Sequence, residues 1–129
     1  MGLSQTTVAD ASGFSSDTVG TPSELVMLGI AALKNPVIAE IVGQQQAELQ
    51  VGGTIHNTNE LLGADGVIGI KTGTTDEAGS CLLFAASYEN ESGEEITIVG
   101  VVMGSKNSDS RFNDSKKLLE SVRQELGLI

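Results

Sequence analysis

The sequence is poor in the residues that build metal sites and disulfide bridges. It contains one cysteine, Cys81, and one histidine, His56, among its 129 residues. A lone cysteine cannot form an internal disulfide bond, and with one histidine it does not complete a zinc ligand set. We therefore expect no metal and no cofactor. Cys81 lies in the apolar run SCLLFAA and is interpreted as a small buried residue, and His56 as a surface or strand-end residue.

Positive charge and long apolar runs are also scarce. Seven lysine and arginine residues stand against 17 aspartate and glutamate residues, so the formal charge is −10. Because binding to nucleic acid depends mainly on clustered lysine and arginine, we exclude a nucleic-acid partner. The sequence has no run of about 18 apolar residues, and its start, MGLSQTTVADASG, lacks the basic and apolar parts of a signal peptide. We expect the chain as written to be soluble.

The first half of the chain predicts an irregular lead-in followed by a helical hairpin. Residues 4–20 are rich in Ser, Thr, Asp and Gly, which favour turns. The sequence TPSE has the spacing of a capping box with proline at the first helical position, and it predicts a helix over residues 22–33. Asn35 is expected to cap a second short helix over residues 36–42. One strand is expected near residues 47–51.

The second half predicts three antiparallel strands and a final helix. The strand-like runs cover residues 67–72, 80–88 and 96–103, and the polar loop ENESGEE joins the last two. These last two runs are apolar at nearly every position, so we expect both of their faces to be covered. The segment SRFNDSKKLLESVRQELG predicts a covering helix, with an apolar stripe formed by Phe112, Leu119, Val122 and Leu126.

One lysine interrupts the central apolar run GVIGIKTGTT. A phosphate-binding loop, G-x-x-x-x-G-K-[ST], looks similar, but Ile70 rather than glycine precedes Lys71, and a strand follows instead of a helix. We therefore reject nucleotide binding. Side chains alternate along a strand, so Gly69 and Gly73 lie on the same side as Lys71 and leave room beside its ammonium group for another backbone. The threonines on either side of Gly73 face the other way.

Three segments together resemble one enzyme family. They are similar, in the same order, to segments of the serine D-alanyl-D-alanine carboxypeptidases, which are low-molecular-mass penicillin-binding proteins. The three segments are HNTNELLGADGVIGIKTGTTDEAGSCLLFAAS, ITIVGVVMGS and SRFNDSKKLL. The similarity extends upstream through ADASGFSSDTVGTPSEL. The resemblance implies a β-lactamase/transpeptidase-like α+β fold, with an antiparallel sheet covered by a C-terminal helix and preceded by a helical hairpin. It also implies removal of the terminal D-Ala from peptidoglycan stem peptides through an acyl-enzyme.

The resemblance assigns roles to five residues. In the family, the Lys-Thr-Gly triad lies on a strand that forms one wall of the active site. Lys71 would supply positive charge beside the nucleophile, Thr72 would bind the terminal carboxylate of the substrate, and Gly73 would leave room for its backbone. The backbone N–H of Thr74 would be one oxyanion donor. Arg111 is an unusual cation at a helix start, and it would bind the free C-terminal carboxylate.

The nucleophile motif of this family is not evident in the sequence. The family also needs S-x-x-K, which carries the nucleophilic serine and its base, and S-x-N on the opposite wall. Ser108 is followed three positions later by Arg111 instead of lysine, and the S-x-N at residues 105–107 lies after Lys71 instead of before it. We therefore expect this chain to hold the carboxylate-binding wall, to lack the nucleophile and to be inactive by itself.

We interpret residues 1–129 as the C-terminal portion of a catalytic domain, a partial domain with a helical part over residues 1–48 and a sheet with a helix over residues 49–129. Three hypotheses remain: a carboxypeptidase fragment, a non-catalytic module that binds peptidoglycan peptides, and a β-lactamase relative. The parent of a carboxypeptidase fragment would act outside the cytoplasmic membrane on stem peptides ending in D-Ala-D-Ala, and would bind β-lactams. Residues 96–103 would form an open, uncharged sheet edge, from which we expect a homodimer.

Overall fold

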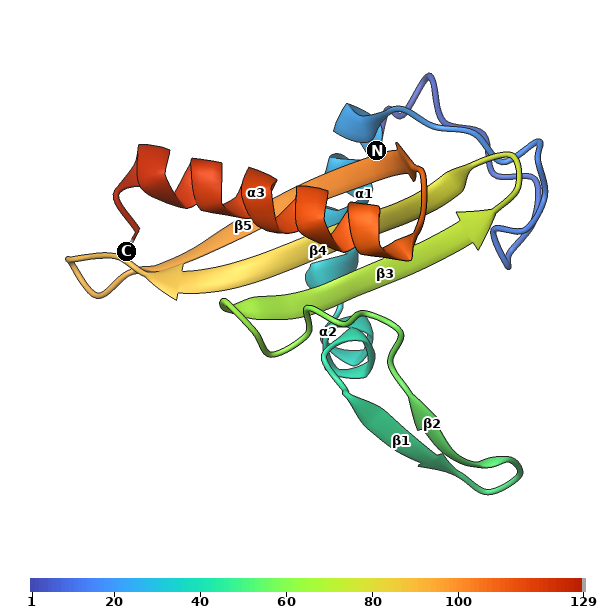
Figure 1. Cartoon of the computed structure of the whole chain (residues 1–129), viewed down its shortest axis with the longest axis horizontal. Helices are drawn as coiled ribbons and strands as arrows, with labels where there is room; N and C mark the ends of the chain where they lie inside the picture. Colours follow the sequence, from blue (N-terminus) through green and yellow to red (C-terminus); the bar gives the residue numbers. More distant parts are fainter. Residues whose placement is uncertain (129) are drawn as a thin grey trace.

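The computed structural model describes residues 1–128 and places three helices around a central antiparallel sheet (Figure 1). In chain order the elements are α1 (Pro22–Leu33), α2 (Pro36–Val42), β1 (Gln46–Leu49), β2 (Gly53–His56), β3 (Val67–Thr75), β4 (Gly79–Glu89), β5 (Glu95–Ser105) and α3 (Ser108–Leu126). The central sheet has the strand order β3-β4-β5, and β1 and β2 form a separate hairpin. The predicted α+β fold with a C-terminal helix is confirmed.

The helical hairpin begins and ends where the capping residues predict. Thr21 accepts a hydrogen bond from the backbone N–H of Glu24 at 3.4 Å, and Asn35 accepts one from that of Val37 at 3.0 Å. Each helix has proline as its first residue. The axes of α1 and α2 meet at 106°. Within residues 1–128 no single helix has the length and apolarity needed to cross a membrane, and the bent pair of α1 and α2 meets that criterion only when the two are counted together.

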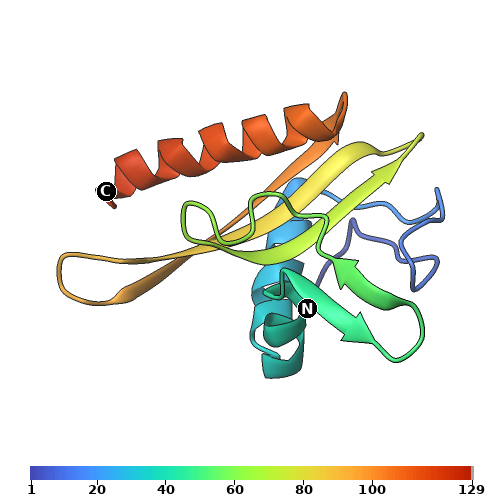
Figure 2. The same ribbon diagram turned by 60° about the horizontal axis from the view of Figure 1, so that its bottom comes forward.

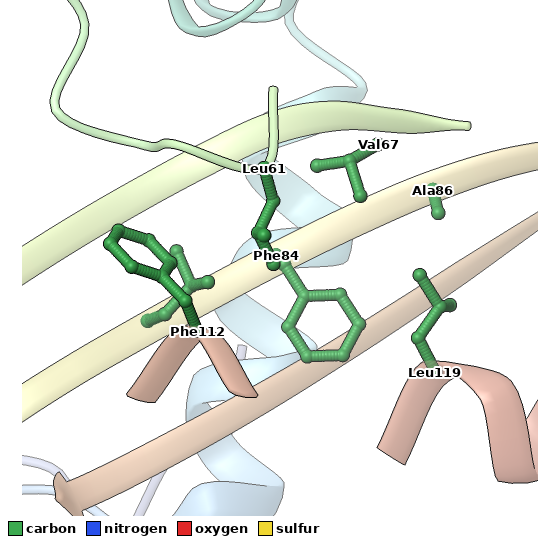
Figure 3. Close-up of a cluster of buried hydrophobic side chains, with 7 residues drawn as sticks. Leu61, Val67, Phe84, Ala86, Phe112 and Leu119 are labelled. Carbon is green, nitrogen blue, oxygen red and sulfur yellow. The ribbon is translucent and has the colours of Figure 1, made fainter. Parts of the chain in front are cut away.

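α1 and α3 cover opposite faces of the central sheet (Figures 1 and 2). On the α1 face, the side chains of Ile70, Leu83 and Val99 pack against Gly29 of α1. Each lies 3.2 Å from the point where a Cβ on Gly29 would be. The α3 face carries the main core (Figure 3), formed by Leu61, Val67, Leu82, Phe84, Ala86, Phe112 and Leu119. This arrangement confirms the expectation that β4 and β5 are covered on both faces.

The apolar stripe of α3 differs from the prediction at its end. Phe112 and Leu119 are buried, but Leu126 is 54% exposed. Gly127 adopts a left-handed conformation with φ of 66° and ends the helix there. The backbone N–H of Leu128 then bonds to the carbonyl of Arg123 at 2.9 Å, and the side chain of Leu128 is 5% exposed. The chain reverses at Gly127, so Leu128 is buried in place of Leu126.

The β1–β2 hairpin was predicted only in part. β1 was expected near residues 47–51 and is observed at Gln46–Leu49, whereas β2 was not predicted. Every residue of β2 is exposed, so this strand has no alternation of buried and exposed residues that a sequence pattern could reveal. The first strand also begins inside the segment that was expected to be helical.

Residues 1–20 form the irregular lead-in that the composition predicts, and two carboxylates organise it. Asp10 accepts hydrogen bonds within its own loop. These bonds lower the pKa of Asp10 to about 2, and the bond from the Ser12 hydroxyl has the largest effect. Glu24 of α1 accepts hydrogen bonds from the backbone N–H of Gln5 and the hydroxyl of Thr6. The bond from Thr6 lowers the pKa of Glu24. The lead-in is thereby tied to α1.

Candidate functional site

The candidate site lies on β3, at one outer edge of the central sheet. β3 carries the sequence KTGT at residues 71–74 and pairs with β4 in a register that sets Lys71 opposite Leu83. No atom lies within 4 Å of the point where a Cβ on Gly73 would be, so the backbone is open to another chain at this point. The side chain of Lys71 is exposed, and its ammonium group donates a hydrogen bond to the carbonyl of Thr72.

The other glycine beside the lysine does not leave an opening. A Cβ on Gly69 would lie 2.9 Å from the side chain of Val42, which belongs to α2. Gly69 therefore allows α2 to pack closely against β3. The expectation of free space on both sides of Lys71 is correct at Gly73. It is wrong at Gly69, because α2 fills the space beside that glycine.

Arg111 reaches the end of the KTGT segment from the first turn of α3. Its Nη1 group donates to the Thr74 hydroxyl at 3.0 Å, to the Gly73 carbonyl at 3.2 Å and to the Cys81 carbonyl at 3.4 Å. Its Nη2 group donates to the Ser108 hydroxyl at 3.1 Å. The side chain is 6% exposed. Two predicted site residues, Thr74 and Arg111, are thus brought together although 37 positions separate them.

The charge of Arg111 is not neutralised by the described part of the chain. No carboxylate of residues 1–128 forms a salt bridge with its guanidinium group. Its Nε atom is buried and has no hydrogen-bond acceptor among the same residues. Its Cζ atom lies over the ring of Phe112, 4.7 Å from the ring centre. A buried guanidinium with unused donors favours an added anionic acceptor, and a carboxylate matches its geometry.

Thr72 contacts a residue that the sequence reasoning missed. The hydroxyl oxygens of Thr58 and Thr72 lie 2.6 Å apart. Thr58 is held between two asparagines: Asn57 accepts a hydrogen bond from the backbone N–H of Asn59 at 2.9 Å, and Asn59 donates from its side chain to the carbonyl of Gly69 at 3.4 Å. The Asn-Thr-Asn sequence was a signal for such local side-chain bonding, because asparagine often bonds to nearby backbone in turns.

Three other residues that the sequence singled out contribute no side chain to the KTGT segment or to the contacts of Arg111, and Cys81 contributes only its backbone carbonyl. Asn107, the last residue of the misplaced S-x-N, caps α3 and accepts a hydrogen bond from the backbone N–H of Ser110 at 2.8 Å. His56 is exposed at the end of β2 and pairs with Gln46. The side chain of Cys81 is half-buried. The structure therefore agrees with the strand-end interpretation of His56, and Cys81 is less buried than expected.

The sequence matches one protein family over most of its length. A family model described as D-alanyl-D-alanine carboxypeptidase matches residues 1–107. A curated relative, the D-alanyl-D-alanine carboxypeptidase of Streptomyces sp. strain K15, is 30% identical over 109 residues, which cover 77% of this chain and 36% of the relative.

Solved structures with the same fold cover nearly all of this chain. Penicillin-binding protein D2 of Listeria monocytogenes, in its ampicillin-bound form, is similar with a TM-score of 0.80 and 31% identity, over 92% of this chain and 49% of that protein. The Streptomyces K15 DD-transpeptidase is similar with a TM-score of 0.68 and 31% identity, over 82% of this chain and 42% of that protein. The chain spans about half the length, or less, of these relatives.

Proposed function

This chain belongs to the D-alanyl-D-alanine carboxypeptidase family, and from that premise we propose that it forms the active-site wall that holds the C-terminal carboxylate of a peptidoglycan stem peptide. The observation that carries this proposal is the meeting of Arg111 with the KTGT segment, where Nη1 lies 3.0 Å from the Thr74 hydroxyl. Arg111 is buried and has no carboxylate partner in residues 1–128. A cation in such surroundings favours an anionic ligand.

Each residue of the segment has a defined part in the proposed site. Thr72 donates its hydroxyl hydrogen to the substrate carboxylate, and Thr58, 2.6 Å away, donates to Thr72 and so directs that hydrogen toward the ligand. Gly73 has no neighbour where a Cβ would lie, so the substrate backbone can approach it. The ammonium group of Lys71 supplies positive charge beside the nucleophile.

The chemistry of the complete enzyme proceeds through an acyl-enzyme. A serine oxygen attacks the carbonyl carbon of the penultimate D-Ala, the terminal D-Ala leaves with its new amine hydrogen, and water then releases the shortened peptide. The backbone N–H of Thr74 donates to the oxyanion that forms during attack. The sequence has no S-x-x-K, so the serine and its base belong to polypeptide outside these 129 residues. β-Lactams occupy the same wall in the complete enzyme, which acts outside the cytoplasmic membrane.

A second candidate function is supported by that missing motif. A module with this wall and no nucleophile would bind peptidoglycan peptides without hydrolysing them. The family match over residues 1–107 favours the carboxypeptidase over a β-lactamase relative, the third candidate.

Substitutions in a complete enzyme that contains this chain test the carboxylate role. Thr72→Val and Arg111→Ala should each lower kcat/KM for a peptide ending in free D-Ala-D-Ala by about 10- to 100-fold, whereas the same peptide with an esterified C-terminus should lose much less. Thr54→Val is the matched control, because Thr54 is an exposed threonine on β2, away from the site. Equal losses for the acid and the ester would contradict the assigned role.

A further inference from the structure

A small hollow lies beyond the KTGT segment, where the lead-in meets the turn that joins β3 to β4 (Figures 1 and 2). It has a volume of about 230 Å³. Pockets that hold whole small molecules have volumes of about 300–1,000 Å³, so this space suits a single side chain. We call it the turn hollow, and its lining includes Ser15, Ser16, Thr18, Thr75, Glu77, Ala78 and Met103.

Under the proposed function, on which this inference rests, the substrate peptide passes beside the turn hollow. Thr72 binds the terminal carboxylate and the N–H of Thr74 binds the carbonyl of the penultimate residue, so the peptide runs antiparallel to β3. The third residue from its C-terminus then lies beside Thr75, which lines the hollow. The register of β3 with β4 is regular over residues 69–75, so Thr75 lies on the same face of the sheet as Lys71 and Gly73.

The lining of the turn hollow combines apolar groups with a single negative charge. Ala78 and Met103 contribute apolar surface, and Met103 is 39% exposed. Within residues 1–128, Glu77 is the one charged residue of the lining, and it takes part in no salt bridge. Asp17 and Asp76 are each next to a lining residue in the sequence and add negative charge nearby. The hollow therefore suits a side chain that is apolar along its length and positive at its tip.

The lead-in side of the turn hollow is held in place by hydrogen bonds within the chain. Asp10 accepts one from the hydroxyl of Thr18 at 3.0 Å and one from the backbone N–H of Ser15 at 3.3 Å. The backbones of Thr7 and Val19 exchange two more, at 2.8 Å and 3.0 Å. This wall is formed before any ligand binds, so a ligand does not have to order it.

We propose that the turn hollow binds the side chain of the third residue from the C-terminus of the substrate, and that Glu77 selects a long side chain with a terminal ammonium group, such as that of lysine. The methylene stem packs against Ala78 and Met103, and the ammonium group donates to the carboxylate of Glu77. An acidic side chain would meet Glu77 with like charge and is disfavoured. Glu77 is thus a specificity-determining residue and takes no part in the bond-breaking step.

Steady-state kinetics of a complete enzyme that contains this chain test the proposal. The substrates are acetyl-Lys-D-Ala-D-Ala and the same peptide with norleucine or glutamate in place of lysine, and norleucine keeps the stem without the ammonium group. The lysine peptide should have a kcat/KM about fivefold above that of the norleucine peptide at low salt, mainly through a lower KM. Glu77→Gln should remove this preference and affect the norleucine peptide much less. Glu77→Lys should make the glutamate peptide better than the lysine peptide.

Two further variants separate the charge of Glu77 from the space of the hollow. Glu91→Gln is the matched control, because Glu91 is an exposed glutamate in the loop between β4 and β5, and it should leave the lysine preference unchanged. Ser16→Leu narrows the hollow without changing its charge. It should lower kcat/KM for the lysine and norleucine peptides alike, and much less for a peptide with glycine as the third residue.

Three results would overturn the proposal. These are equal kcat/KM for the lysine and norleucine peptides, a lysine preference that survives both Glu77 variants, and a Glu77→Gln loss that is the same for every peptide. The lysine peptide with an esterified C-terminus distinguishes this failure from that of the proposed function. If the acid is still preferred over the ester, only the role of the turn hollow is wrong. If acid and ester are used alike, the path along β3 is wrong and both proposals fail.

Discussion

The isolated chain should form no covalent adduct with a labelled penicillin. Acylation needs a nucleophile that is activated by a neighbouring base. Within the described residues, the hydroxyl of Thr72 contacts that of Thr58, and the hydroxyl of Thr74 accepts a hydrogen bond from the guanidinium group of Arg111, which only donates, so neither hydroxyl is hydrogen-bonded to a base that could take up its proton. The sequence contains no S-x-x-K that could supply the serine and its lysine base. Under the proposed function, the chain supplies a carboxylate-binding wall without the group that would attack the β-lactam.

Intact-mass spectrometry after incubation with the penicillin measures this directly. Listeria monocytogenes penicillin-binding protein D2, which is solved in an ampicillin-bound form, is the positive control and should gain the mass of one antibiotic. A stoichiometric adduct on this chain, located on one of its residues by peptide mapping, would show that a nucleophile exists within the 129 residues and would contradict the account.

Arg111→Ala should lower the free energy of unfolding by about 2–4 kcal/mol. The guanidinium group donates to Thr74, Gly73 and Cys81 through Nη1 and to Ser108 through Nη2. Alanine would leave these acceptors without their donor in a place that is largely closed to water, because Arg111 is buried. The end of β3 would also lose its connection to α3.

Arg123→Ala is the matched control, since it removes the same side chain from the same helix. The Cζ atom of Arg123 lies over the ring of Tyr88, 4.7 Å from the ring centre, and its Nε donates to the carbonyl of Leu128 at 3.2 Å. These two contacts should be worth about 1 kcal/mol together. Urea denaturation of both variants gives the comparison. Equal losses, or no loss for Arg111→Ala, would contradict a network that joins α3 to β3.

Elements with local signals were predictable from the sequence. The first residues of α1 and α2 follow from Thr21 and Asn35, because a side-chain cap and a following proline fix a helix start without help from the rest of the fold. The end of α3 was less predictable. Leu126 continues the helical stripe, and only the reversal at Gly127 shows that Leu128 is buried instead.

The members of the candidate site were named from the sequence and stay predictions, whereas their contacts could not be named in advance. The KTGT segment and Arg111 were identified through the resemblance to a family, because 37 positions separate Thr74 from Arg111 and no periodicity links them. The contact of Thr58 with Thr72 depends on how residues 57–59 lie along β3, and the closure of Gly69 depends on the path of α2. Such contacts follow from tertiary packing and leave no pattern in a single sequence.

Recognition of a free carboxylate at β3 is tested most directly by nuclear magnetic resonance on the ¹⁵N-labelled chain. The ligands are acetyl-Lys-D-Ala-D-Ala and the same peptide with a C-terminal amide, which removes only the charge. The acid should shift the backbone signals of residues 72–74 and the Nε–H signal of Arg111, and the amide should leave them nearly unchanged. Equal shifts with both peptides, or shifts confined to residues away from β3 and Arg111, would contradict it.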